Sequence, residues 1–268
     1  MKPIQKKMTV EQQAEEIVSL FDLSLPIDPL SIAREEGIKS VEAEGNYDAR
    51  IEHHVGNKRG QDIYLLLFAP TTMKRPLSRQ RFSIAHELGH FYIPRHRKEL
   101  QGGKLWTHKS SPTAVHNSLE REANAFAAAL LLPTKLVTPL FHSYGLDLEG
   151  ICGLADTCQT SLRATARRYT EITDEACGVI LSKGGKFEWS HFSLEAKDRG
   201  YGWRLHPTVP KASSVHTAMM DSTYKIHKRQ TRTAAWLVDN RSSLDAYEES
   251  LRLNGDWVLT MLFWDFPE

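Results

Sequence analysis

The chain has 268 residues and a mass of 30.5 kDa, which is enough for one large or two modest domains. It has 34 lysines and arginines against 33 aspartates and glutamates, so its net charge of +1 gives no global attraction to nucleic acid or anionic membranes. With 41% hydrophobic and 25% charged residues and a mean hydropathy of −0.41, the composition argues against a membrane-spanning, disordered or fibrous protein.

The N-terminal segment MKPIQKKMTVEQQ becomes polar where the apolar region of a signal peptide would begin, so we expect a cytoplasmic protein with no membrane association. The odd number of cysteines, Cys152, Cys158 and Cys177, agrees with this expectation. We predict that they are small buried residues rather than disulfide partners or zinc ligands.

Two helices are expected near the N-terminus. Thr9 and Gln12 form a capping box at the start of an amphipathic segment over about 10–21. Asp28 and Pro29 then have the N-cap and first-turn positions of a shorter helix. Short strand-like segments follow and predict a small antiparallel sheet, at 38–41, 49–55 and 63–68.

The central part of the chain is predicted to be mainly helical. A helical pattern runs from Ser78 to Pro94, and an alanine- and leucine-rich pattern runs over 119–132. The polar segment 95–117 between them is long enough to predict a flap or lid. Further helices are expected to about Arg168.

Beyond residue 174 the sequence is richer in residues typical of β-strands. Five of the six tryptophans lie in this part of the chain, all of them after residue 185. The expected strands there are 177–181, 187–192, 231–238 and 257–263. We therefore predict an α+β protein with two domains. The first, 1–173, is mainly helical with a small antiparallel sheet and a helix-turn-helix-like segment at about 146–170. The second, 174–268, is a smaller β-rich domain with a sensory or regulatory role.

The chemistry is carried by an HExxH motif on a predicted helix, formed by His86, Glu87 and His90. Residues four apart on an α-helix differ by about 40° in azimuth and about 6 Å along the axis, so both imidazoles can bind one Zn²⁺. Glu87 lies beside such an ion and can take a proton from water whose pKa the metal lowers toward about 7.

A catalytic zinc needs a third protein ligand, and several residues compete for this role. His96 would complete a metzincin-like spacing, but that geometry requires a glycine where this chain has Ile93. Glu120 begins an ExxAN sequence that resembles the ExxAD element of gluzincin-like peptidases, in which the glutamate binds the metal. We favour Glu120 over His96 and Glu122. On this interpretation Asn124 accepts a hydrogen bond from a ligand histidine.

The segments RQRFSIAHELGH (79–90) and EREANAFAAALLLP (120–133) resemble the ImmA/IrrE metallopeptidases. PIDPLSIAREEGI (26–38) resembles the opening of that family. The resemblance implies a gluzincin-like fold and a zinc-dependent endopeptidase that cleaves a helix-turn-helix repressor, derepressing a stress-response or mobile-element programme. By motif position, it implies metal ligands at His86, His90 and Glu120 and a catalytic base at Glu87.

Two other functions compete with this interpretation. Segment 151–169 has the pattern of a helix-turn-helix with Arg163, Arg167 and Arg168 exposed, which would suit a DNA-binding or partner-binding regulator whose metal site is structural. The balanced charge argues against direct DNA binding. A metal-binding pseudo-enzyme is the third alternative, and the presence of Glu87 argues against it.

The expected mechanism is that Zn²⁺, with Mn²⁺ as the alternative ion, polarises the scissile carbonyl while Glu87 moves a proton from water to the leaving amine. The strand at 63–68 is a candidate edge for pairing with an extended substrate. The residues considered for stabilising the oxyanion are Tyr92, His108 and His116.

Overall fold

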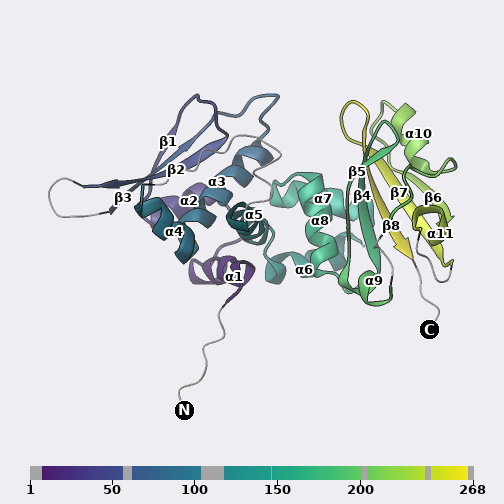
Figure 1. Ribbon diagram of the computed structural model, residues 1–268, viewed down its shortest axis with the longest axis horizontal. Coiled ribbons are helices and arrows are strands. Elements are labelled where there is room, and N and C mark those ends of the chain that lie inside the picture. Colours follow the sequence, from purple (N-terminus) through teal and green to yellow (C-terminus); the bar gives the residue numbers. More distant parts are fainter. Residues whose placement is uncertain are drawn as a thin grey trace, which may run out of the picture. The chain divides into compact units, whose positions relative to one another are not determined.

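The computed structural model of the chain describes residues 8–56, 62–103, 118–145, 147–200, 204–238 and 243–264. Within these ranges the chain has helices α1–α11, a three-stranded sheet and a five-stranded sheet, which confirms the predicted α+β class (Figure 1). It divides into two compact units. The first comprises Met1–Val137 and Asp156–Ser161, and the second Thr138–Ala155 and Leu162–Glu268. The domain boundary expected near residue 174 stays a prediction.

The first unit begins with two short helices whose ends follow from their capping residues. Helix α1 (Val10–Leu20) starts at Thr9, whose side chain accepts from the Gln12 backbone while the Gln12 side chain accepts from the Thr9 backbone. Helix α2 (Pro29–Glu35) is capped by the Asp28 carboxylate. Both helices lie where the sequence predicts them.

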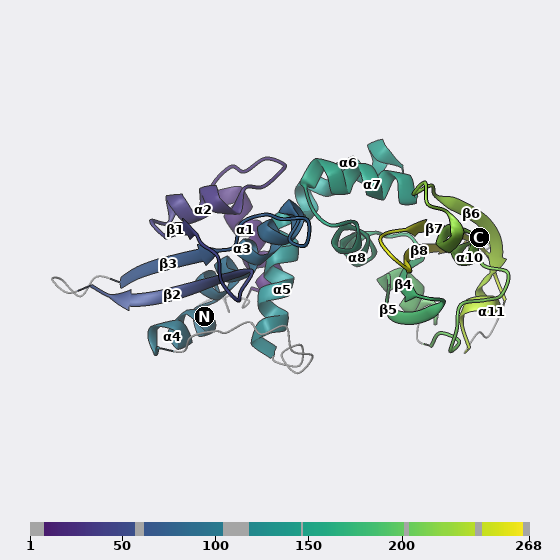
Figure 2. The same ribbon diagram turned by 90° about the horizontal axis from the view of Figure 1, so that it is seen from above.

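The three-stranded sheet has the order β1-β3-β2, with β1 (Lys39–Glu42), β2 (Ala49–Val55) and β3 (Asp62–Phe68), as Figure 2 shows. Strand β3 is antiparallel to β2 but parallel to β1, so the sheet is mixed rather than purely antiparallel. The two directions arise because β2 and β3 form a hairpin and β1 pairs with the other side of β3. The expectation that 63–68 offers a free edge is therefore wrong, since β3 is paired on both sides.

Helix α3 (Leu77–Tyr92) lies between this sheet and helix α5 (Ser118–Leu131), and α1 packs on α5. Gly89 permits the close contact of α3 with α5, because an added Cβ would lie 3.2 Å from the Ala123 Cα and 3.2 Å from the Phe126 ring. The contact places the last turn of α3 against the middle of α5.

The sequence suggested that the whole segment 95–117 is a loop, but its first part is helical. Helix α3 ends before Ile93, and Pro94 occupies the first position of a new helix, α4 (Pro94–Gln101), where proline needs no hydrogen-bond partner. Residues 104–117 lie outside the described part of the chain, so the predicted flap is described only up to Gly103.

The chain continues through α6 (Thr134–Tyr144), α7 (Leu148–Cys158) and α8 (Leu162–Ile172). The second unit contains an antiparallel sheet of order β5-β4-β8-β7-β6. Its strands are β4 (Cys177–Lys183), β5 (Lys186–Phe192), β6 (His227–Arg232), β7 (Asp245–Arg252) and β8 (Trp257–Trp264). Its short helices are α9 (Leu194–Asp198), α10 (Ser214–Met220) and α11 (Thr233–Trp236). Helix α8 packs on β4 and β5, whereas α10 packs on β6, β7 and β8.

Two parts of this sheet differ from the sequence expectation. The strand expected at 231–238 is the end of β6 followed by α11, and β7 was not predicted. Strand β7 was missed because its sequence is polar and does not show the apolar residues expected of a buried strand. The carboxylates of Glu248 and Glu249 can be buried because each has a hydrogen-bond partner. Glu248 accepts from the Trp236 indole at 2.8 Å, and Glu249 accepts from the Leu148 backbone at 2.7 Å.

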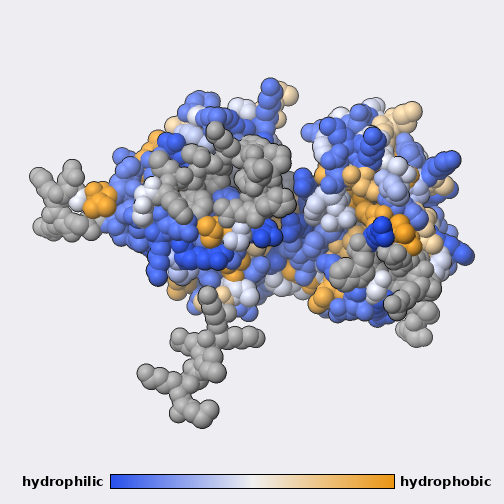
Figure 3. All heavy atoms as spheres, in the orientation of Figure 1, coloured by the Kyte–Doolittle hydropathy of each residue, from blue (hydrophilic) through white to orange (hydrophobic). Residues whose placement is uncertain are grey.

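The second unit has its own hydrophobic core, which includes the buried rings of Trp236 and Trp264. The three cysteines are free, and Cys158 and Cys177 are buried as expected, whereas Cys152 is only partly buried. Hydrophilic residues predominate on the face of the chain shown in Figure 3, and hydrophobic residues form small separate patches. Among the described residues, no single helix has the length and hydropathy to cross a membrane, although the bent pair of α5 and α6 meets that test together.

Candidate metal centre

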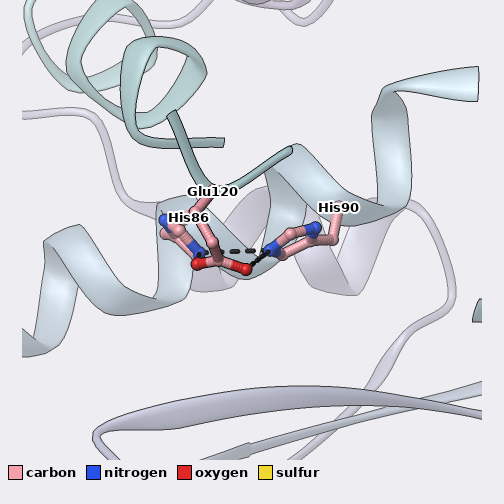
Figure 4. A group of neighbouring side chains, drawn as sticks. All are labelled: His86, His90 and Glu120. Atoms are coloured by element: carbon pink, nitrogen blue, oxygen red, sulfur yellow. Dashed lines mark hydrogen bonds and ion pairs between the residues drawn. The ribbon is translucent and has the colours of Figure 1, made fainter. Parts of the chain in front are cut away.

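Helix α3 and the first turn of α5 bring together three side chains of types that can bind a metal ion. His86 and His90 project from the same face of α3, and Figure 4 shows their imidazoles and the Glu120 carboxylate pointing toward one another. The two Nε2 atoms are 3.1 Å apart. Oε2 of Glu120 lies 3.3 Å from Nε2 of His86, and Oε1 of Glu120 lies 3.6 Å from Nε2 of His90.

These separations fit a tetrahedral metal site. Zinc bonds of about 2.0 to 2.1 Å to nitrogen and oxygen place neighbouring ligand atoms of a tetrahedron about 3.3 Å apart. The distance of 3.1 Å between the two Nε2 atoms and the distances of 3.3 and 3.6 Å from each of them to its nearer Glu120 oxygen lie close to this value. Two imidazole nitrogens and one carboxylate are also the donor types that zinc accepts. The group could therefore hold a divalent ion and leave a fourth position for water or substrate.

Asn124 fixes the orientation of the first histidine. Its Oδ1 lies 2.9 Å from Nδ1 of His86. An amide oxygen only accepts hydrogen bonds, so Nδ1 carries the proton and Nε2 presents its lone pair to the group. Asn124 follows Glu120 by one helical turn of α5, so the same helix supplies the carboxylate and this partner.

Glu87 is 1% exposed and lies beside His86, outside the group of three. Its Oε2 accepts a hydrogen bond of 2.8 Å from the backbone N–H of Ile51 on β2. The three-stranded sheet thus holds the carboxylate that the sequence predicts to be the base.

The competing candidate His96 occupies a different position. Its Nδ1 lies 3.1 Å from Nδ1 of His90, the ring nitrogen that does not face the group. Its Nε2 lies 3.1 Å from Oε2 of Glu122, and Glu122 also binds Arg95. Burial lowers the pKa of His96, although the nearby Glu122 acts in the opposite direction. The lowered pKa favours the neutral form of the ring. Neither His96 nor Glu122 belongs to the group of three.

Of the residues considered for the oxyanion, only Tyr92 lies in the described part of the chain. Its hydroxyl donates to Glu36 at 2.9 Å and its ring stacks on Phe126. Burial, together with Glu36, raises the pKa of this hydroxyl. His108 and His116 lie outside the described residues.

Of the three arginines that the suggested helix-turn-helix was predicted to expose, Arg163 and Arg167 are exposed and Arg168 is buried. Arg168 is 7% exposed and pairs with Glu171. Arg163 and Arg167 lie over the ring of Trp189, at 5.3 and 6.0 Å from its centre. The prediction is therefore wrong for Arg168, which lies on the buried side of α8, and holds for Arg163 and Arg167.

Sequence reasoning missed two contacts of this centre. Ile51 gave no signal because its contribution is a backbone N–H, which any residue except proline would supply. The contact of His96 with His90 was missed because the sequence shows only that His96 follows His90 by six residues. It does not show the bend at Pro94 that turns the His96 side chain back toward His90.

Two comparisons with known proteins match this chain, one by family model and one by fold. Residues 73–170 match the model of the IrrE N-terminal-like domain of peptidase family M78. Among curated proteins, none matches the chain. A solved structure of a Mycobacterium tuberculosis transcriptional regulator is similar in fold, with a TM-score of 0.60, 13% identity and coverage of 95% of this chain and 87% of that chain. The resemblance to the IrrE family is thus confirmed, and the chain contains an IrrE N-terminal-like domain over residues 73–170.

Proposed function

We propose that this chain is a metal-dependent endopeptidase that cleaves a helix-turn-helix transcriptional repressor and so activates a stress-response or mobile-element programme. The observation that carries the catalytic part is the convergence of His86, His90 and Glu120 beside the buried carboxylate of Glu87. Zn²⁺ is the proposed ion and Mn²⁺ the alternative. The repressor is proposed from the matched family alone.

A divalent ion bound by these three residues would supply Lewis-acid chemistry, polarising the scissile carbonyl and making water more acidic. Glu87 is the general base in this proposal. It accepts the proton of the attacking water and delivers it to the nitrogen of the leaving amine. The hydrogen bond from Ile51 keeps this carboxylate in place during both transfers.

We place an extended substrate segment along the outer edge of β2. Strand β3 cannot take this role because both its neighbours are present, whereas β2 is at the edge of the sheet. Strand β2 also supplies the N–H that holds Glu87, so a peptide paired with this strand would lie near the base. In this proposal the β-rich segment 174–268 has a regulatory role.

The test is the metal content and the cleavage activity of matched variants. Elemental mass spectrometry on zinc-saturated protein should find about one zinc per chain in the wild type, a loss in Glu120→Ala and retention in His96→Ala. Wild-type protein should also cleave a helix-turn-helix repressor encoded beside its gene, detected as product peptides by mass spectrometry. A wild type that takes up no metal when zinc is supplied would overturn the proposal in favour of a regulator without a catalytic metal.

A further inference from the structure

We propose that His96 and Glu122 are positioning residues that orient His90 toward the metal. The inference rests on the proposed function in one respect only, the binding of a metal by Nε2 of His90. It assigns a role to two residues that the ligand group does not contain.

The contacts form a continuous chain from the metal group to the protein surface. Nε2 of His90 faces Glu120, and Nδ1 of the same ring lies 3.1 Å from Nδ1 of His96. Nε2 of His96 in turn lies 3.1 Å from Oε2 of Glu122. His90 and His96 are both 0% exposed, whereas the Glu122 side chain is 32% exposed and its carboxylate binds Arg95.

The protons along this chain have one consistent arrangement when a metal occupies the group. Nε2 of His90 offers its lone pair, so Nδ1 carries the proton and donates to Nδ1 of His96. His96 then carries its own proton on Nε2 and donates it to the carboxylate of Glu122. Every ring nitrogen has a partner, and the negative charge of Glu122 stands at the end of the chain.

The same helix supports both ligand histidines. Asn124 of α5 holds His86 directly, and Glu122 of α5 holds His90 through His96. Helix α5 also supplies Glu120. A shift of α5 relative to α3 would therefore move the carboxylate and both orienting contacts together, which makes the close α3–α5 contact at Gly89 important for the site.

The decisive experiment compares zinc affinities in competition with a chromophoric chelator, using full-length protein. His96→Leu removes both ring hydrogen bonds and should weaken zinc binding about 10- to 100-fold, the usual effect of losing such a partner. His96→Gln offers His90 an amide oxygen and should recover part of that loss. Lys98→Gln, an exposed change on the same helix, should bind zinc like the wild type.

Glu122→Ala provides a second test that leaves the core intact, since Glu122 is partly exposed. It should weaken zinc binding in the same direction but less than His96→Leu, whereas Arg121→Ala at the neighbouring exposed position should not. In zinc-bound protein labelled with ¹⁵N-histidine, the Nδ1 proton of His90 should be protected from exchange in the wild type and lose this protection in His96→Leu. Circular dichroism verifies that each variant is folded.

Wild-type affinity and unchanged proton exchange in folded His96→Leu and Glu122→Ala would overturn the inference. If His96→Leu does not fold, Glu122→Ala decides alone. A wild type without zinc affinity would overturn both this inference and the proposed function. The predicted affinity pattern without any repressor cleavage would leave the positioning role supported and the proposed function wrong.

Discussion

The backbone N–H of Ile51 donates a hydrogen bond of 2.8 Å to Oε2 of Glu87, joining the edge strand β2 to the motif helix α3. A buried carboxylate is costly without such donors, because it leaves water and gains nothing in return. The contact makes the sheet part of the candidate catalytic centre.

Replacing Glu87 by glutamine should separate metal binding from catalysis. The amide oxygen of the introduced side chain can still accept from Ile51, so the fold and the zinc stoichiometry should be unchanged. The base is lost, and repressor cleavage should fall about 10²- to 10⁴-fold. Product formation and elemental analysis of the same sample test this. Cleavage at the wild-type rate would show that Glu87 is not the base.

The role of Asn124 can be tested with a pair of substitutions. Asn124→Ala removes the acceptor of the His86 Nδ1 proton and should weaken zinc binding about 10- to 100-fold. Asn124→Asp keeps an acceptor oxygen at this position and should bind zinc more tightly than Asn124→Ala. Chelator competition measures both, and equal affinities for the two variants would exclude the orienting role.

Gly89→Val should lower the stability of the first unit. Its Cβ would lie only 3.2 Å from the Ala123 Cα, so α3 and α5 would have to separate. Overpacking of this kind costs about 1 to 3 kcal/mol. A lower thermal midpoint than that of the wild type is expected. Arg121→Val, at an exposed position of α5, is the control. It measures only the loss of stability caused by a β-branched residue in a helix, without any overpacking. Equal midpoints for the two variants would contradict this account.

His191 should make the second unit less stable in mild acid. Burial lowers the pKa of His191, the positive charges of Lys197 and Arg167 act in the same direction, and Glu171 opposes them. The unfolded chain, with a histidine pKa of about 6.5, then binds the proton more readily than the folded one. The contribution of neutral His191 to stability is therefore fully present above the pKa of the unfolded chain. It is lost as the pH falls toward the lower pKa of His191 in the folded protein.

The measurement is urea unfolding at about pH 7.5 and about pH 5.5, followed by tryptophan fluorescence. His191→Gln retains a partner for the Thr170 hydroxyl, which lies 2.8 Å from Nδ1 of His191, but does not titrate. The variant should lose less stability on acidification than the wild type. The same loss in both proteins would show that His191 does not contribute.

Local patterns predicted the elements that carry the centre. The capping residues Thr9 and Asp28 marked the starts of α1 and α2, and the spacing of His86 and His90 required only a helix. Such features depend on residues within one or two turns of each other, so the sequence contains all the information that they need. The resemblance of the two motifs to a known family indicated Glu120.

The sequence alone therefore determined the α+β class, the motif helix and the residues available to bind a metal. Tertiary structure decided what long-range packing controls. It set β1 parallel to β3, buried Glu248 and Glu249 in a strand whose polar pattern concealed it, and turned His96 back onto His90. It also brought Glu120 to His90, thirty residues earlier, through the contact of α3 with α5 at Gly89. Side-chain periodicity encodes which face of an element is apolar, but the partner of that face depends on how the whole unit packs.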